Sequence, residues 1–240
     1  MLAARGRIAG PIILTLLAIT PLNAKVLDKS TTISGLNIHY KVVLPADFDP
    51  AKPYPAILAF PPGDQTEQMV MSTLQRNWAP AAPRRGYLVF VPAAPVQGLF
   101  SAEGARAFPG FLNQLLGDFK IRDNKFHIAG MSNGGISAFH IAASYPQFFW
   151  SVTVFPGLLQ DPTPERIAAL ANMCINMHAG EFDAEWLRAM QQQSALFRAK
   201  GYTVNTTVEK GQYHVIGTLT GDGSSRLFEE IENSTKGCKK

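Results

Sequence analysis

A serine flanked by glycines stands where a short apolar run meets a helical pattern. Residues 126–129 read Phe-His-Ile-Ala, and residues 130–135 read Gly-Met-Ser-Asn-Gly-Gly. Beyond them, apolar residues recur at the spacing of one helix face. Glycines in this context allow a sharp turn from strand to helix, and Gly130 and Gly134 are expected there because side chains would collide across the turn. Ser132 is therefore the candidate nucleophile; a serine that only caps a helix is the alternative.

A serine hydroxyl becomes a strong nucleophile when a nearby imidazole takes its proton and a carboxylate orients that imidazole. Asp183 closely follows the apolar run at residues 174–178, and His214 closely follows the strand pattern at residues 203–209. The order serine, acid, histidine is the order of α/β-hydrolases. We therefore predict a catalytic triad of Ser132, Asp183 and His214.

Both the base and the acid have a rival in the sequence. His178 ends a predicted strand and is the alternative base, although a histidine before the acid would break the chain order. Glu181 is the alternative acid. The other histidines, His39, His127 and His140, lie inside predicted strands or a helix, where we expect hydrogen-bonded structural roles.

Acyl transfer also requires backbone N–H groups that stabilise the negative charge on the carbonyl oxygen. Asn133, the residue after the nucleophile, is the first candidate donor. The second should come from the loop after residues 56–60, which begins Pro-Pro-Gly-Asp. Proline has no N–H to donate. Gly63 is therefore the predicted second donor, with Asp64 as the alternative.

Strand and helix patterns alternate along most of the chain and predict the scaffold for these residues. Strands are expected at 31–34, 36–44, 56–60, 87–91, 125–129, 150–155, 174–178 and 203–209, and helices at 67–78, 108–119, 132–145, 163–172, 184–200 and 224–235. Such alternation predicts an α/β-hydrolase fold, a mostly parallel sheet of about eight strands with helices on both faces and an antiparallel second strand. The candidate residues follow the carboxyl ends of strands, where α/β sheets bind ligands.

The first residues have the pattern of a secretory signal peptide. Residues 1–24 contain Arg5 and Arg7, then an apolar run, and end in a small residue. We therefore expect a secreted or periplasmic protein without stable membrane insertion after cleavage; an uncleaved anchor is the alternative. Residues 25–240 are expected to form one α/β-hydrolase domain.

Charge and cysteine content narrow the function classes further. The formal net charge is +4, of which two charges come from Arg5 and Arg7, and the remaining basic residues form no patch typical of nucleic-acid binding. No His or Cys cluster has the spacing of a metal site. The two cysteines, Cys174 and Cys238, are predicted either to form one disulfide or to be two buried thiols. Nothing in the sequence indicates an oligomeric state.

Four segments resemble the secreted esterase family that includes polyhydroxybutyrate depolymerases and feruloyl or acetylxylan esterases. They are residues 40–45, the proline-rich residues 49–55, the apolar residues 56–60 and the glycine-flanked residues 130–135. The resemblance implies a serine hydrolase acting on carboxylic esters of small molecules or polymers, without a metal or an organic cofactor. It also implies an acid in a His-Gly-x-x-Asp-like segment, which residues 178–183 match with one extra residue.

Two segments depart from that family. Residues 61–63, Pro-Pro-Gly, stand where these enzymes usually have His-Gly, and residues 92–107 are short where they usually carry a Trp-rich insertion. A short lid predicts an open site that suits small aryl esters with short acyl chains. Four aromatic residues are candidates to line the acyl pocket, with simple core packing as the alternative: Tyr213, Phe108, Phe111 and Trp186.

Two other functions share these features. A serine peptidase related to the prolyl oligopeptidase catalytic domain would have the same fold and triad order, but usually has a further domain that this chain leaves no room for. A hydrolase-like binding protein without turnover is the other alternative, and the double proline at residues 61–62 is the only feature that favours it.

Overall fold

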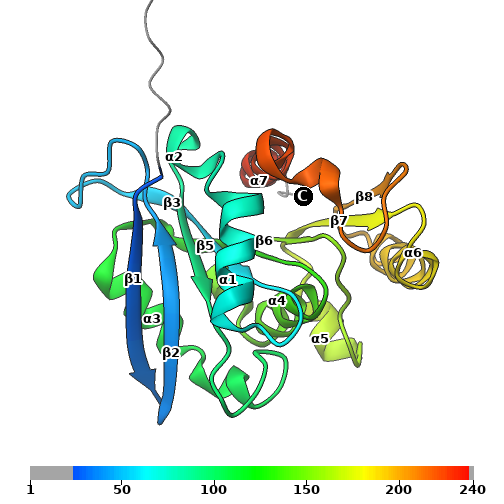
Figure 1. Ribbon diagram of the computed structural model, residues 1–240. Coiled ribbons are helices and arrows are strands. Elements are labelled where there is room, and N and C mark those ends of the chain that lie inside the picture. Colours follow the sequence, from blue (N-terminus) through cyan, green and yellow to red (C-terminus); the bar gives the residue numbers. More distant parts are fainter. Residues whose placement is uncertain (1–23, 238–240) are drawn as a thin grey trace, which may run out of the picture.

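The computed structural model describes residues 24–237, which are built around an eight-stranded sheet (Figure 1). The spatial order of the strands is β1-β2-β4-β3-β5-β6-β7-β8. β2 runs antiparallel to β1 and β4, and the other neighbours are parallel, as predicted. The strands are β1 (Val26–Ile33), β2 (Leu36–Val43), β3 (Tyr54–Phe60), β4 (Leu88–Pro92), β5 (Ile121–Gly130), β6 (Phe149–Val154), β7 (Cys174–Gly180) and β8 (Val204–Glu209).

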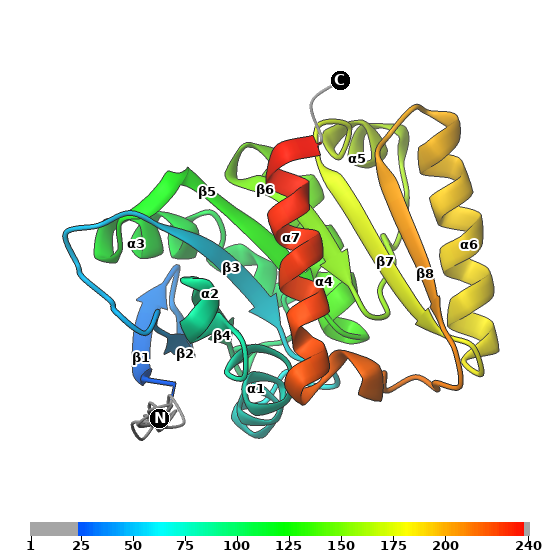
Figure 2. The same cartoon turned by 90° about the horizontal axis from the view of Figure 1, so that it is seen from above.

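Helices cover both faces of the sheet (Figure 2). The helices are α1 (Glu67–Thr73), α2 (Ala82–Arg85), α3 (Gly110–Asp118), α4 (Asn133–Ser144), α5 (Pro164–Ala169), α6 (Ala184–Ala199) and α7 (Ser225–Gly237). Shorter segments are the π-helical η1 (Leu74–Trp78) and the 3-10 turns η2 (Glu103–Ala107), η3 (Pro146–Phe148), η4 (Gly217–Leu219) and η5 (Gly221–Ser224). The helix predicted over residues 67–78 is thus divided into α1 and η1.

The central strands are apolar throughout because each of their faces meets a separate hydrophobic cluster. In β3, Ala56, Leu58 and Phe60 belong to the cluster under α3, α4, α5 and α6, whereas Ile57 and Ala59 belong to the cluster under α1, α2 and α7. Successive side chains of a strand point to opposite faces, so a strand covered on both sides reads as a continuous apolar run. This pattern made the central strands recognisable in the sequence.

β1 and β5 both begin earlier than predicted. β1 was expected to begin at residue 31 but begins at Val26, and β5 was expected to begin at residue 125 but begins at Ile121. Asp123 and Asn124 have φ angles of 56° and 53°, and the pairing with β3 shifts register next to them. Residues 121–124 therefore do not show the apolar pattern of a strand in the sequence, because three of them are polar and the backbone there is irregular.

Two predictions concern residues outside the described range. The predicted signal peptide falls almost entirely on residues 1–23, and Cys238 also lies outside, so export and the Cys174–Cys238 disulfide stay predictions. Cys174 is buried, with its sulfur 3.6 Å from the Ser234 carbonyl oxygen of α7. Between residues 24 and 237, no helix has the length and apolar character needed to cross a membrane.

Candidate active site

Ser132 lies on the sharp turn between β5 and α4. Its backbone has φ 57° and ψ −122°, a combination that non-glycine residues rarely adopt and that costs free energy. Its N–H donates a 2.7 Å hydrogen bond to the Pro156 carbonyl oxygen, which helps to hold the turn. The serine is therefore held at the helix N-terminus by the surrounding fold rather than by its own conformational preference.

The glycines around Ser132 are required by close backbone approaches. A Cβ atom on Gly130 would lie 2.1 Å from the Gly134 carbonyl oxygen, and one on Gly134 would lie 2.2 Å from the Phe60 carbonyl oxygen. A Cβ on Gly135 would lie 2.4 Å from the Pro156 carbonyl oxygen. These distances are far below normal contact, so the steric role expected for the glycines agrees with the structure.

The fold brings Ser132, His214 and Asp183 into direct contact. Ser132 Oγ lies 2.9 Å from His214 Nε2, and Asp183 Oδ2 lies 2.7 Å from His214 Nδ1. The His214 side chain is 37% exposed and that of Asp183 is 13% exposed. The imidazole therefore has one nitrogen facing a hydroxyl and the other facing a carboxylate, and it remains accessible from solvent. This arrangement can take a proton from the serine and stabilise the resulting imidazolium.

Backbone contacts hold the loop of Asp183 against the loop of His214. Gly180 lies so close to the second loop that a Cβ on it would be 2.1 Å from the Tyr213 carbonyl oxygen. The Phe182 N–H donates to the Gln212 carbonyl oxygen over 2.9 Å. These contacts fix the two loops next to one another immediately before the acid and the histidine.

The rival base and acid have other partners. His178 is buried, with Nδ1 2.9 Å from Glu209 and Nε2 2.7 Å from Glu230. Burial lowers the pKa of His178, but the bonds to the two carboxylates outweigh it and leave that pKa raised. Glu181 accepts hydrogen bonds from Lys210 Nζ and the Gly211 N–H, and these lower its pKa. Neither side chain contacts Ser132 in the hydrogen bonds of the described residues.

The other histidines have structural partners. His127 is buried, with Nδ1 2.7 Å from Ser151 Oγ, and burial lowers its pKa to about 3, so it is neutral. His140 lies 3.1 Å from a guanidinium nitrogen of Arg166, and burial together with that cation lowers its pKa. His39, described below, lines a surface hollow.

The loop of Gly63 is tied to the helix that begins at Asn133. Asn133 Nδ2 donates to the Gly63 carbonyl oxygen over 3.0 Å, and Gly63 has φ 59°. The Gln65 N–H donates to the Pro62 carbonyl oxygen and closes a tight turn around Gly63. Among the described residues, the N–H groups of Gly63 and Asn133 have no protein acceptor. Both N–H groups therefore remain available to a substrate oxygen.

Gln65 is a positioning residue that the sequence reasoning did not single out. It is fully buried, with Nε2 3.0 Å from Ser137 Oγ and Oε1 accepting the Phe100 N–H over 3.1 Å. Its own carbonyl oxygen accepts the Ala94 N–H. The side chain thereby fixes the Gly63 loop to α4 and to the segment after β4. A glutamine in a proline- and glycine-rich loop carries no sequence signal for burial, so only the fold reveals this role.

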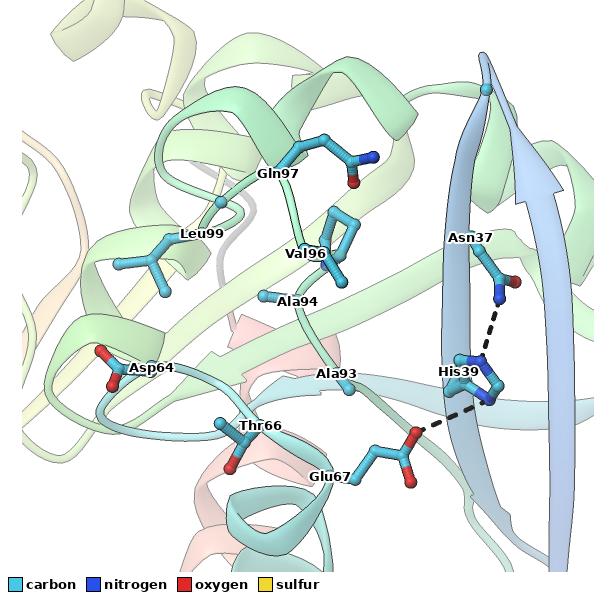
Figure 3. Close-up of a pocket in the computed structure, with 13 residues that line it drawn as sticks. Asn37, His39, Asp64, Thr66, Glu67, Ala93, Ala94, Val96, Gln97 and Leu99 are labelled. Atoms are coloured by element: carbon cyan, nitrogen blue, oxygen red, sulfur yellow. Dashed lines mark hydrogen bonds and ion pairs between the residues drawn. The ribbon is translucent and has the colours of Figure 1, made fainter.

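A hollow of about 670 Å³ lies between the start of β2, residues 64–67 and the segment after β4 (Figure 3). Asp64 and Glu67 line it together with Asn37 and His39 of β2. His39 Nε2 is 3.0 Å from Asn37 Nδ2, and its Nδ1 is 3.7 Å from Glu67 (Figure 3). Apolar residues such as Val96 and Leu99 complete the lining, which contains none of Ser132, Asp183 and His214.

A smaller pocket of about 240 Å³ touches the loops of the site itself. We call it the elbow pocket. Ser132, Asp183 and His214 do not line it either, but its lining includes their sequence neighbours Met131 and Val215, and also Pro62 beside Gly63. The remaining lining residues come from α1, η1, the end of β6 and the segment after His214: Met69, Ser72, Thr73, Arg76, Asn77, Phe155, Ile216 and Thr220.

The four aromatic residues proposed for an acyl pocket divide into two groups. Phe108 and Phe111 are buried in the main core, as the alternative interpretation held. Trp186 packs against His214, with ring centroids 5.3 Å apart. Tyr213, the residue before His214, is 66% exposed. None of the four lines the elbow pocket.

The cavities and carboxylates form no metal centre among residues 24–237, because no cluster of three potential ligand side chains occurs there.

We compared the chain with protein-family models, with curated proteins and with solved structures. No protein-family model matches the chain, and no curated protein matches its sequence. Among solved structures, a thermostable esterase has a TM-score of 0.68 at 16% identity, over 89% of this chain and 62% of that one. The feruloyl esterase module from Clostridium thermocellum complexed with sinapinate has a TM-score of 0.71 at 11% identity, over 85% of this chain and 89% of that one.

A provisionally named dipeptidyl aminopeptidase IV from Bacteroides ovatus is also similar, with a TM-score of 0.65 at 13% identity, over 90% of this chain and 36% of that one. The chain thus spans less than two thirds of this protein and of the thermostable esterase. At these identities the likeness shows the fold alone. The chain has the α/β-hydrolase fold, as the sequence predicted.

Proposed function

We propose that this protein is a serine hydrolase that cleaves carboxylic esters through an acyl-enzyme. The observation that supports the proposal most directly is the contact chain from Ser132 Oγ through the His214 ring to Asp183 Oδ2, at 2.9 Å and 2.7 Å. The similarity of the fold to esterases adds support. The resemblance to polyhydroxybutyrate depolymerases remains a prediction from the sequence.

In acylation, Ser132 Oγ attacks the ester carbonyl carbon while His214 Nε2 takes the hydroxyl proton. The carbonyl oxygen becomes negatively charged, and the N–H groups of Gly63 and Asn133 stabilise it. When the tetrahedral intermediate collapses, His214 gives its proton to the leaving alcohol oxygen. Asp183 keeps the proton on Nδ1 throughout and stabilises the imidazolium.

In deacylation, a water molecule repeats the attack. His214 takes a proton from the water, the hydroxide oxygen bonds to the acyl carbon, and the proton is returned to Ser132 Oγ as the acid leaves. Pro61 and Pro62 contribute no N–H but restrict the loop before Gly63. In this proposal they hold the Gly63 N–H in position for the oxyanion. The double proline, the one feature that favoured an inactive binding protein, is then compatible with catalysis.

The proposal is tested by reaction of the full chain with a fluorophosphonate probe and by hydrolysis of a series of 4-nitrophenyl esters. Labelling of Ser132 is expected. Turnover should be highest for short acyl chains, because the elbow pocket has a volume of only about 240 Å³. Ser132→Ala should abolish both. Labelling at another serine, or none, would contradict the assignment.

A serine peptidase is the second candidate, because the dipeptidyl aminopeptidase-like protein shares the fold over 90% of this chain. Peptidases of this kind hold a substrate amine or chain end with further groups. Hydrolysis of dipeptidyl nitroanilides at rates above those of nitrophenyl esters would favour this candidate.

We also infer export to the periplasm or the medium from residues 1–24. The support is the sequence pattern alone: two arginines, an apolar run and a small residue at the expected cleavage position. N-terminal sequencing of the mature protein tests it, with a first residue near Lys25 as the expected result.

A further inference from the structure

The elbow pocket has an apolar lining with one charge on it. Met69, Met131, Phe155 and Ile216 are among its apolar lining residues, and Phe155 and Ile216 are themselves buried. Arg76 is the only ionisable side chain among the residues that line it. A pocket of this composition fits a short aliphatic chain that ends in an anionic group.

Arg76 is available for such a group. No ion pair and no side-chain hydrogen bond joins it to the described part of the chain, and its side chain is exposed. By contrast, Arg85 and Arg226 each bind glutamates of the protein. A guanidinium carries its charge at any pH at which the protein is folded and matches the geometry of a carboxylate.

The backbone around Arg76 is also unusual. Arg76 lies in the π-helical segment η1, which continues α1 and packs against η5 (Figure 2). Asn77, the next residue, is buried and donates to the Leu219 carbonyl oxygen over 2.9 Å. π-Helical turns are rare and occur frequently at functional sites. The segment anchors itself through Asn77 and leaves the preceding arginine at the pocket.

The pocket suits the acyl part of the ester better than the alcohol part. The leaving alcohol must take its proton from His214 Nε2 and then give way to water, so its side of the site has to be open. The acyl group instead stays bonded to Ser132 between the two steps. A pocket beside Met131 with a buried floor can retain it.

We propose that the elbow pocket binds acyl groups that end in a carboxylate, with Arg76 pairing with that carboxylate. This inference rests on the proposed ester hydrolysis and names its substrate class as half-esters of short aliphatic dicarboxylic acids. The methionines and Phe155 contact the methylene groups, and Arg76 distinguishes a charged chain end from a methyl group.

The test compares 4-nitrophenyl half-esters of glutaric, adipic and pimelic acid with the neutral 4-nitrophenyl esters of equal carbon number, each corrected for hydrolysis without enzyme. The leaving group is constant, so differences report on the acyl part. We expect the charged member of the best pair to have a kcat/KM about 10-fold higher, as one charge-assisted hydrogen bond at a partly exposed site provides. Arg76→Gln should bring that ratio to about one, and added salt should lower it in the unmodified protein.

Arg122→Gln is the matched control. Arg122 is also exposed and has no ion pair among the described residues, but it lies near the start of β5, at the opposite end of the strand from Ser132. It should leave the ratio unchanged. An equal fall of the ratio in both variants would reflect general surface charge and overturn the inference. A ratio near one in the unmodified protein, or a ratio that Arg76→Gln does not change, would also overturn it. Hydrolysis of the neutral esters in those cases leaves the proposed function standing, whereas no hydrolysis of any ester overturns both.

Discussion

Two histidines of this protein form hydrogen bonds with carboxylates, and their surroundings differ in one decisive respect. His214 faces the Asp183 carboxylate on one side and the Ser132 hydroxyl on the other, and is partly exposed. His178 faces a carboxylate on both sides, Glu209 and Glu230, and is 1% exposed.

The difference decides which ring can act as a base. A carboxylate only accepts hydrogen bonds when ionised, so both nitrogens of His178 must carry protons and its imidazole is held as a cation. A hydroxyl can donate, so Nε2 of His214 can be the unprotonated nitrogen that accepts the serine proton. Proximity to a carboxylate therefore does not show which histidine can accept a proton; the group that faces the other ring nitrogen does.

The Glu209 carboxylate is the centre of the buried site. It accepts hydrogen bonds from His178, from both terminal nitrogens of Arg226 and from Thr218 Oγ1. The bond from His178 lowers the pKa of Glu209, and the bonds from Arg226 and Thr218 lower it further against the effect of burial. Because Glu209 precedes and Thr218 follows the loop of His214, this network joins the two ends of that loop. We therefore expect the buried site to act on stability and the exposed site to act on turnover.

The largest expected effect comes from breaking the exposed site. Ser132→Ala or His214→Ala should lower ester turnover by about 10⁴- to 10⁶-fold, because the two residues act as one unit. The double variant should be little slower than either single variant. Single-turnover and steady-state rates with a 4-nitrophenyl ester measure this. Turnover that survives His214→Ala but not His178→Ala would reverse the comparison.

Breaking the buried site should cost stability. His178→Ala leaves the carboxylates of Glu209 and Glu230 close together without the cation between them, and we expect a loss of about 3–5 kcal/mol in the free energy of unfolding. Urea unfolding at neutral pH measures it. The remaining folded protein should still react with a fluorophosphonate at Ser132. Normal stability with lost labelling would instead place His178 in the catalytic machinery.

Removing one oxyanion donor should have an intermediate effect on turnover. Proline is unsuitable at residue 63 because Gly63 has φ 59° and proline requires a negative φ. Replacing Gly63 by glycolic acid changes only the N–H to an ester oxygen, and we expect turnover to fall about 10²- to 10³-fold.

Gly63→Ala is the control for this change, because it keeps the N–H and a Cβ there meets no atom within 4 Å. It should cost only about 1 kcal/mol of backbone strain in folding. If the glycolate substitution leaves turnover intact while the same exchange at Asp64 does not, the donor is one residue further along.

The smallest expected effect is the pH dependence of stability. The raised pKa of His178 means that its contribution is complete below its ordinary pKa and is lost as pH rises through the raised value. The lowered pKa of Glu209 means that its contribution is present above about pH 4.5 and is lost as pH falls. The network should therefore stabilise most between about pH 4.5 and 6.5 and progressively less above that range.

Glu230→Gln sharpens this prediction. It removes one of the two carboxylates that raise the pKa of His178, so unfolding free energies measured from pH 6 to pH 9 should fall less steeply than in the unmodified protein. Each unit of pKa shift corresponds to about 1.4 kcal/mol. An equally steep fall in both proteins would mean that another group is responsible.

The sequence by itself determined the scaffold and the sharp turn that carries Ser132. Continuous apolar runs identify strands covered on both faces, and helical spacing identifies the helices between them. Gly130 and Gly134 mark two positions of a turn at which no side chain fits, so the position of Ser132 between them follows from local chemistry. The order of the acid and the histidine along the chain follows from the order of strands.

Tertiary structure alone decided which polar groups meet. His214 and Ser132 are 82 positions apart, and His178 and Glu230 are 52 apart, so their contacts depend on which strands and helices become neighbours. Asp183 and Glu181 are two residues apart, and only the path of their loop shows which carboxylate reaches His214. The burial of Gln65 and the position of Arg76 at an apolar pocket likewise carry no local pattern, because hydrogen-bond partners and pocket linings come from segments that meet only in the folded chain.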